Sequence, residues 1–209
     1  MLPRPVAQPV AVVQRTGFSD FPQSLWALES PEELEPSVAH TARWTAALRA
    51  IEDERPDALF QDPLAKVLAG EAALKEWRAT MADCIAKQPH SRSHIAIRCR
   101  AVDDLIMEQL NDMTHAWSFG AQAMQVVNIG AGMCTRPWRL SLPGAIWFEV
   151  DRPDIIRLKK KILSQLPVAP TVGSYVAIGA DLSEQEVLLP ETLTANGFDP
   201  HLPTLFVIE

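Results

Sequence analysis

The chain has 209 residues, of which 47% are apolar and 22% charged, a composition that indicates a folded protein with a sizeable core rather than a disordered chain. The net charge of −7 disfavours nucleic acid as the main partner, because phosphate contacts need a basic surface. No apolar run has the length of a membrane span or of a signal-peptide core, so we expect a cytoplasmic protein with no membrane partner.

The cysteines and histidines form no recognisable metal or disulfide motif. Cys84, Cys99 and Cys134 are an odd number without a Cys-x-x-Cys pair, so we expect reduced thiols. His90 and His94 are four residues apart, but a proline directly precedes them and no carboxylate lies between them. The sequence therefore predicts no metal site.

The first 120 residues predict an extension followed by helices. Residues 1–36 hold six of the seventeen prolines and show no sustained period, which indicates an N-terminal extension without regular structure. Residues 37–120 are expected to form a helical region that caps the protein. Its helices are predicted, from apolar spacing and from Asp62-Pro63 and Gly70 as start and stop signals, over 39–52, 64–68, 72–87 and 93–111.

For two of the predicted helices the sequence also predicts which side chains are buried or exposed. The helix over 93–111 is expected to bury Ile97, Ala101, Leu105 and Ile106. The run 159–161, three lysines near the end of a later helix, is expected on a solvated face that complements the helix C-terminus.

From residue 121 the pattern changes to strands that alternate with helices. Short runs rich in β-branched and apolar residues predict strands at 125–129, 146–150, 174–178 and 205–208. Helices are predicted at 153–163 and 184–195. This alternation predicts an α/β, Rossmann-like fold with a parallel sheet and right-handed crossovers. We expect residues 121–209 to be this core, truncated after its fourth strand.

A glycine turn follows the first predicted strand. Gly130 and Gly132 allow a sharp backbone turn and a close approach of ligand. Glu149 and Asp151, at the end of the next strand, are placed to bind a ribose diol. NAD and S-adenosylmethionine both fit this pattern, but Thr135 replaces the third glycine that favours a pyrophosphate, which favours S-adenosylmethionine. A strand-to-helix turn without a ligand is the structural alternative.

Six ordered stretches between about Thr41 and Glu209 point to one family. They are RAIE with RPDALF within 49–60, DPLA at 62–65, IAIRCR with DDL within 95–105, NIGAG with TR within 128–136, FEVDRP at 148–153 and GFDP at 197–200. Together they resemble the leucine carboxyl methyltransferase-like family, in particular its bacterial branch of S-adenosyl-L-methionine-dependent methyltransferases related to polyketide O-methyltransferases. The resemblance implies a class I methyltransferase fold and S-adenosyl-L-methionine as cofactor, and it implies that a helix within 37–120 contacts this cofactor.

The resemblance also implies which residues contact the methionine end of that cofactor. Arg98 matches the arginine that pairs with the methionine carboxylate, and a guanidinium fork suits that anion. Glu209 matches the acidic residue near the amino group, and Gly130 the glycine against the cofactor, with Gly132 in the same turn. An arginine on a helix surface is the alternative for Arg98.

The resemblance implies in the same way which residues contact the adenosine end of the cofactor. Asp151 matches the ribose-binding acid, with a helix N-cap before the following proline as its alternative or additional role. Asp181 and Leu182 match the pair beside the adenine, where the carboxylate accepts from the exocyclic amine. The alternative for Asp181 is a cap of the next helix.

Cys134 departs from the family pattern, which usually has aspartate directly after the glycine turn. The departure removes a carboxylate beside the expected cofactor site. A reactive thiol is disfavoured there, because no base lies nearby in the sequence.

The expected function is S-adenosyl-L-methionine-dependent methylation of a carboxylate or hydroxyl oxygen on a small molecule. Oxygen is favoured because the fourth strand ends in Glu209 rather than in the Asn/Asp-Pro-Pro-aromatic run typical of nitrogen methylation. An NAD(P)-dependent oxidoreductase and a non-catalytic cofactor-binding remnant are the alternatives. The sequence identifies no catalytic residue, no particular acceptor and no oligomeric state.

Overall fold

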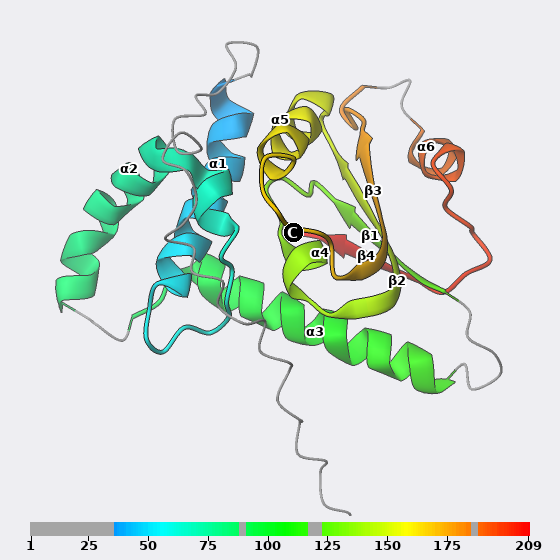
Figure 1. Cartoon of the computed structure of the whole chain (residues 1–209), viewed down its shortest axis with the longest axis horizontal. Helices are drawn as coiled ribbons and strands as arrows, with labels where there is room; N and C mark the ends of the chain where they lie inside the picture. The colour runs from blue at the N-terminus through cyan, green and yellow to red at the C-terminus, as the bar shows by residue number, and fades with distance from the viewer. Residues whose placement is uncertain (1–35, 88–90, 117–122, 185–187) are drawn as a thin grey trace, which may run out of the picture.

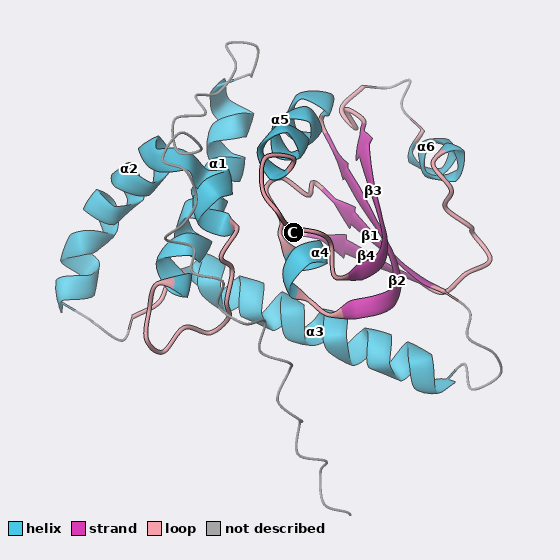
Figure 2. Ribbon diagram, viewed as in Figure 1, coloured by secondary structure: helices cyan, strands magenta, loops and turns pink. Residues whose placement is uncertain are grey.

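The computed structural model describes residues 36–87, 91–116, 123–184 and 188–209, in which helices surround one sheet (Figure 1, Figure 2). The elements in chain order are α1 (Pro36–Asp53), α2 (Ala65–Lys87), α3 (His94–Ala116), β1 (Met124–Ile129), α4 (Arg136–Arg139), β2 (Leu142–Asp151), α5 (Pro153–Leu163), β3 (Val172–Gly179), α6 (Leu189–Ala195) and β4 (Thr204–Ile208). The predicted extension lies outside the described residues apart from Pro36, and His90 also lies outside them. The division at residues 36 and 120 stays a prediction.

The four strands are parallel and lie in the order β3-β2-β1-β4. β1 is central, and its Val127 lies opposite Phe148 of β2 and Phe206 of β4. Four consecutive residues of β1 are buried, as expected for a strand that helices cover on both faces. The predicted α/β class with a parallel sheet is therefore confirmed.

Neighbouring residues of β1 pack on opposite faces of the sheet, because successive side chains of a strand point in opposite directions. Val126 is buried in a cluster with Ile106 of α3. Val127 is buried in a second cluster with Leu193 of α6. Burying an apolar side chain of this size contributes about 1.5–3 kcal/mol. The helix α3 and the helix α6 thus hold the central strands between them.

α1 and α2 pack against each other beside the sheet and against α5 (Figure 1). α2 joins the two predicted helices at Gly70, whose φ of 76° and ψ of 164° mark a kink inside one element. None of the helices in the described ranges is long and apolar enough to cross a membrane.

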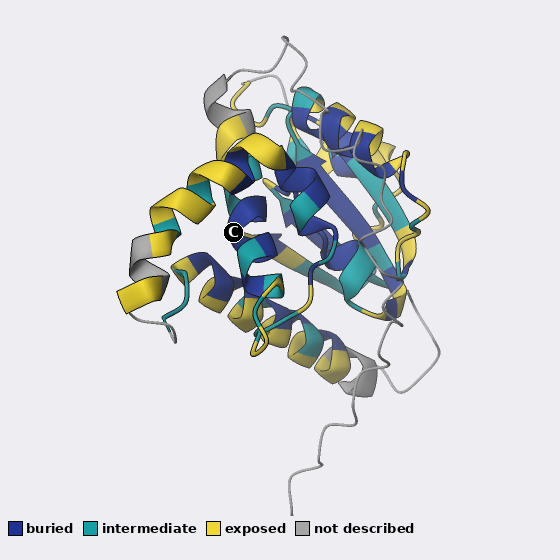
Figure 3. Cartoon of the chain, turned by 60° about the vertical axis from the view of Figure 1, so that its left-hand side comes forward, coloured by how far each residue is buried: buried dark blue, intermediate teal, exposed yellow. Residues whose placement is uncertain are grey.

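The predicted face of α3 is wrong. Ile97 and Leu105 are 55% and 56% exposed, whereas Ile106 is buried as predicted. The buried stripe runs at spacings of three and four residues and includes a carboxylate: Ala96, Cys99, Asp103, Ile106 and Leu110. Figure 3 shows α3 with this buried stripe on one side and exposed residues on the other. A search for apolar periodicity misses such a stripe because an aspartate occupies its middle.

α6 is shorter than predicted. It begins at Leu189, with Pro190 in its first turn, where the missing N–H of proline costs no helical hydrogen bond. Glu184, the predicted start, is not helical, and residues 185–187 lie outside the described residues.

Candidate cofactor site

Each predicted binding residue of the core ends or follows a strand, so the parallel sheet brings these residues to one edge. The order β3-β2-β1-β4 arranges them as Asp181, Asp151, the turn at Gly130 and Glu209. β1 and β4 are neighbours although the chain between them visits β2 and β3. Ligands of open α/β sheets bind beyond the carboxyl ends of the strands at such a switch point.

The glycine turn leaves open space at its first glycine and is in van der Waals contact with α1 at its second. Gly130 and Gly132 have φ of 69° and 50°, which L side chains rarely adopt. A Cβ on Gly130 would meet no heavy atom within 4 Å, whereas a Cβ on Gly132 would lie 3.5 Å from the Cβ of Ala42 in α1. The turn therefore contacts α1 at Gly132 and leaves open space in front of Gly130.

Asp151 holds this turn from the end of β2. One carboxylate oxygen accepts from the backbone N–H of Gly132 at 2.6 Å and the other from that of Arg152 at 2.7 Å. The side chain makes no capping hydrogen bond to α5, whose N-cap is Arg152, so the helix-cap alternative is not what the structure shows. Each carboxylate oxygen can accept a second hydrogen bond, which leaves Asp151 able to bind hydroxyl groups.

Asp181 and Leu182 lie just past the end of β3. Asp181 accepts hydrogen bonds from the hydroxyl of Ser183 at 2.6 Å and from its backbone N–H at 3.0 Å, and these two bonds lower the pKa of its carboxyl. Because α6 begins only at Leu189, Asp181 is not the cap of that helix. Leu182 is 41% exposed and leaves an apolar surface at this end of the edge.

At the other end of the edge Glu209 bridges two arginines. Its Oε1 accepts from Nε of Arg98 in α3 at 3.0 Å, and its Oε2 accepts from Nη1 of Arg136 in α4 at 2.6 Å. Burial opposes the charge, but the hydrogen bonds and charges of Arg136 and Arg98 outweigh it and lower the pKa of Glu209. The fold thus joins two predicted residues that are 111 positions apart, and adds Arg136.

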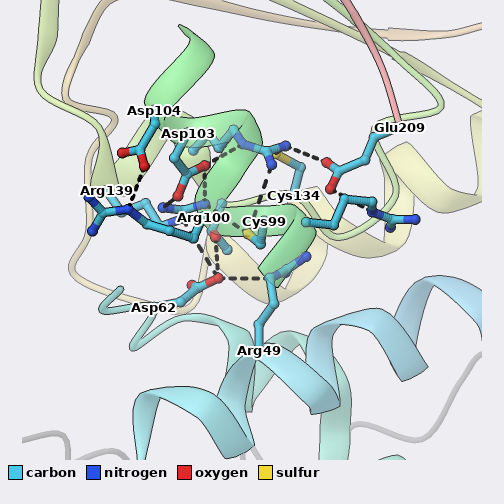
Figure 4. Close-up of polar contacts among 12 residues, drawn as sticks. Arg49, Asp62, Cys99, Arg100, Asp103, Asp104, Cys134, Arg139 and Glu209 are labelled. Carbon is cyan, nitrogen blue, oxygen red and sulfur yellow. Dashed lines mark hydrogen bonds and ion pairs between the residues drawn. The ribbon is translucent and has the colours of Figure 1, made fainter. Parts of the chain in front are cut away.

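A chain of buried ion pairs runs from Arg136 to Arg49, with Nε of Arg139 3.8 Å from Asp62 as its central link. Figure 4 shows Asp62, Asp103 and Arg139 of this chain close together. Nε of Arg136 donates to Asp103 at 2.7 Å, and Arg139 donates to both oxygens of the same carboxylate. Asp62 accepts from Nε of Arg49 at 2.8 Å, and Arg49 donates to the carbonyl of Met133 at 2.5 Å. The network connects the methionine end of the predicted site with the loop after β1.

Thr135 belongs to this network rather than to an open helix end. Its hydroxyl donates to Asp62 at 2.6 Å, and the residue is 1% exposed. The following helix α4 has only four residues, and its arginines point into the network. A dinucleotide pyrophosphate needs the accessible N-terminus of a longer helix, which this arrangement lacks.

Two thiols line the network. Cys134 and Cys99 place Sγ 3.8 Å from Nη1 and Nη2 of Arg136, and Cys99 also accepts from Arg139 at 3.2 Å. Burial raises the pKa of the Cys99 thiol to about 11. Both cysteines are buried and free, so a buried cysteine side chain occupies the position after the glycine turn.

Glu149 is not at the edge, although its spacing made it a candidate ribose ligand. It is fully buried, and its Oε2 accepts from Nζ of Lys159 and from the hydroxyl of Tyr175, both at 2.6 Å. Lys159 is 1% exposed and also lies over the ring of Trp138, so the predicted solvated lysine face is wrong for this lysine. Burial and the adjacent carboxylate raise the pKa of the Tyr175 hydroxyl above its ordinary value.

The structure adds residues that sequence reasoning left without a role: Arg49, Asp62, Asp103, Arg136 and Arg139. All five lie in or beside the six motif stretches, which was the available signal. Among the described residues, no three His, Cys, Asp or Glu side chains are grouped so as to hold a metal ion.

Comparison with known proteins identifies the family. Residues 42–209 match the model of the leucine carboxyl methyltransferase family. A Mycolicibacterium gilvum protein named "Putative S-adenosyl-L-methionine-dependent methyltransferase" is 31% identical over 185 residues, which cover 85% of this chain and 58% of the relative. Two Streptomyces coelicolor proteins of the same description are 33% and 34% identical; the matches cover 84% and 85% of this chain, and 56% and 60% of those relatives. The chain thus spans less than two thirds of the length of these relatives, and it belongs to the leucine carboxyl methyltransferase family.

Proposed function

We propose that the chain binds S-adenosyl-L-methionine along the carboxyl edge of the sheet and that the protein transfers its methyl group to an oxygen of a small molecule. One observation carries the proposal. The sheet arranges Asp181, Asp151, the turn at Gly130, and the Arg98–Glu209 pair in the same order as adenine, ribose and methionine occur in the cofactor. Family membership and the names of the relatives support the same cofactor.

The residues present fit such a ligand. Open space in front of Gly130 admits a chain that passes close to the backbone. Asp151 keeps lone pairs for the two ribose hydroxyls after its backbone bonds are counted. Arg98 is 45% exposed at its side chain, so its guanidinium is accessible to a carboxylate.

The main alternative, an NAD(P)-dependent oxidoreductase, fits these contacts less well. A dinucleotide needs a phosphate-binding helix N-terminus, whereas Thr135 and the short α4 are committed to Asp62 and Asp103. S-adenosylmethionine has no phosphate, and its zwitterionic end matches one arginine beside one carboxylate.

Bound S-adenosylmethionine supplies a methyl group on a sulfonium, an electrophile with a neutral thioether as leaving group. The acceptor oxygen would have to be held in line with that methyl group. A carboxylate acceptor is already ionised and needs no base, whereas a hydroxyl must lose its proton. The residues of this chain then have to orient the two reactants and exclude water, so we assign no catalytic residue.

Isothermal titration with S-adenosylmethionine and, separately, with NAD tests the cofactor. We expect binding of the methyl donor, and a loss of affinity of about tenfold or more in Arg98→Ala and in Asp151→Ala, since each removes charge-assisted hydrogen bonds. Arg100→Ala and Asp154→Ala are the controls: Arg100 lies on α3 with Arg98 but pairs with Asp104, and Asp154 lies three residues after Asp151, at the start of α5, but pairs with Arg152. Binding of NAD alone would overturn the proposal.

The acceptor class needs a separate assay. Transfer of a labelled methyl group from S-adenosylmethionine to a panel of small carboxylates, phenols, alcohols and amines should label oxygen acceptors. Exclusive labelling of amines would show that the inference drawn from Glu209 at the end of β4 is wrong.

A further inference from the structure

The methionine end of the proposed site is closed by the protein's own charges. Glu209 accepts a hydrogen bond from the exposed guanidinium of Arg98, the group that we propose binds the carboxylate of the cofactor. Its second oxygen is held by Arg136, whose side chain is only 3% exposed. The carboxylate of Glu209 therefore has one accessible partner and one buried partner.

The buried partner is fixed and the accessible one is not. Arg136 is bound at Nε by Asp103, and Asp103 is itself held by two hydrogen bonds from Arg139. Among the described residues Arg98 pairs with Glu209 alone, and its side chain is 45% exposed. Because an exposed ion pair contributes at most about 1 kcal/mol, a ligand can separate Arg98 from Glu209 at little cost. Separating Glu209 from Arg136 would take a carboxylate away from a guanidinium whose side chain is only 3% exposed, which costs more.

The thiols beside Arg136 preserve this arrangement. Cys134 and Cys99 lie against its two terminal nitrogens as weakly polar groups. Only two carboxylates, Asp103 and Glu209, therefore hydrogen-bond to Arg136 among the described residues. An aspartate in place of Cys134 would add a third carboxylate that competes with Glu209.

We propose that the Arg98–Glu209 ion pair is the closed form of the methionine end of the cofactor site, and that Arg136 is the positioning residue that keeps Glu209 in place when a ligand opens it. The carboxylate of the incoming amino-acid end replaces Glu209 on Arg98. The oxygen that Glu209 releases accepts from the ligand's ammonium group, while its other oxygen stays on Arg136. A zwitterion thus enters an existing ion pair, and every charge keeps an opposite partner. This inference rests on the proposed binding of S-adenosylmethionine.

The exchange requires both charges on the ligand. S-adenosylhomocysteine carries the carboxylate and the ammonium, its decarboxylated analogue only the ammonium, and 5′-methylthioadenosine neither. The decarboxylated analogue would bring a cation beside Arg98 without an anion to replace Glu209. We therefore expect it to bind about tenfold or more weakly than S-adenosylhomocysteine. 5′-methylthioadenosine leaves the ion pair closed and reports on the adenosine end alone.

Titration of the 209-residue chain and its variants with these three ligands tests the inference. Glu209→Gln and Arg136→Lys should each lower the affinity for S-adenosylhomocysteine by about tenfold, and change that for 5′-methylthioadenosine by less than about twofold. Arg100→Lys, an exposed arginine on α3, is the control and should change neither affinity. If Arg136→Lys fails to fold, Glu209→Gln, at a side chain that is 20% exposed, gives the same readout.

The outcomes separate the two proposals. If the chain binds none of the three ligands, the proposed function fails. If S-adenosylhomocysteine binds but its decarboxylated analogue binds equally well, or if the variants weaken 5′-methylthioadenosine to the same extent, the exchange is wrong and Arg136 has a structural role only. The exchange is supported if both variants lose affinity for S-adenosylhomocysteine relative to 5′-methylthioadenosine and if Glu209→Gln keeps the melting temperature of the unaltered chain.

Discussion

Two clusters of buried charges lie on the same side of this sheet, and only one of them has the properties of a binding site. In the closed cluster, Lys159 of α5 and Tyr175 of β3 both donate to Glu149 of β2, with almost no exposure of the Lys159–Glu149 ion pair. In the open cluster, Asp103 and Arg136 are equally buried, but the network reaches solvent through Glu209 and Arg98.

The two clusters differ in whether their network of charged groups reaches an accessible side chain. Each charged group of the closed cluster has its partner inside it, so the cluster can hold α5 against β2 and β3 but offers nothing to a ligand. The open cluster ends at an accessible arginine at the carboxyl edge of the sheet and at the carbonyl of Met133 in the glycine turn. Burial and charge alone therefore do not indicate a site; their connection to the switch point does.

Lys159→Met should have the largest effect on stability and none on the ligand. It leaves the Glu149 carboxylate buried without its cation, which costs about 3–5 kcal/mol in free energy of unfolding. Denaturant unfolding measures the loss, with Lys161→Met, an exposed lysine on the same helix, as the control. A weakened affinity for S-adenosylmethionine in folded Lys159→Met would break the distinction between the two clusters.

Asp62→Asn should affect both stability and binding. The neutral amide weakens the bonds from Arg49 and Thr135, for an expected loss of about 2–3 kcal/mol. Since Arg49 also holds the carbonyl of Met133 beside the glycine turn, the affinity for S-adenosylmethionine should fall severalfold as well. Unfolding curves and titrations compared with Asp112→Asn, at an exposed position of α3, measure both effects. Lost stability with unchanged affinity would make the open cluster purely structural.

The smallest effect is a pH dependence that arises in the open cluster. Burial raises the pKa of the Cys99 thiol from 9.0 to about 11, so the folded protein keeps a proton that the unfolded chain releases in this range. The stabilisation is complete below pH 9 and is lost as the pH rises toward 11, at up to about 1.4 kcal/mol per pH unit.

Cys99→Ala removes this contribution. Denaturant unfolding between pH 8 and pH 11 should therefore show a shallower decline in Cys99→Ala than in the unaltered chain. Equal slopes in the two proteins would show that Cys99 is not protected as its position in the open cluster requires.

The sheet and the edge residues are the part of this molecule that sequence patterns predict well. Strands, glycine turn and acidic strand ends have local signals, and a parallel sheet brings strand ends together whatever the details of packing. Asp151, Asp181 and Glu209 therefore lie at the predicted edge. Family resemblance, not spacing, singled out Asp181 and Glu209, and it added Arg98, which no local pattern distinguishes from Arg100 two residues later.

The buried networks could not be predicted because their partners are far apart in the sequence. Arg136 meets Asp103 from 33 positions away and Glu209 from 73, and no spacing rule relates such residues. The predicted buried face of α3 is wrong for the same reason. Asp103 is buried because Arg136 and Arg139 neutralise it, so the buried stripe of α3 contains a charged residue. The sequence likewise does not show that Lys159 is buried, because its partner Glu149 lies on another element, β2.

A crystal structure of the chain with S-adenosylhomocysteine tests the central claim most directly. We expect the adenine beside Asp181 and Leu182, the ribose hydroxyls on Asp151, and the ligand carboxylate on Arg98. Glu209 should have left Arg98 for the ligand's ammonium while it remains on Arg136. A ligand bound elsewhere, or one bound at this edge with the Arg98–Glu209 pair still closed, would contradict the account.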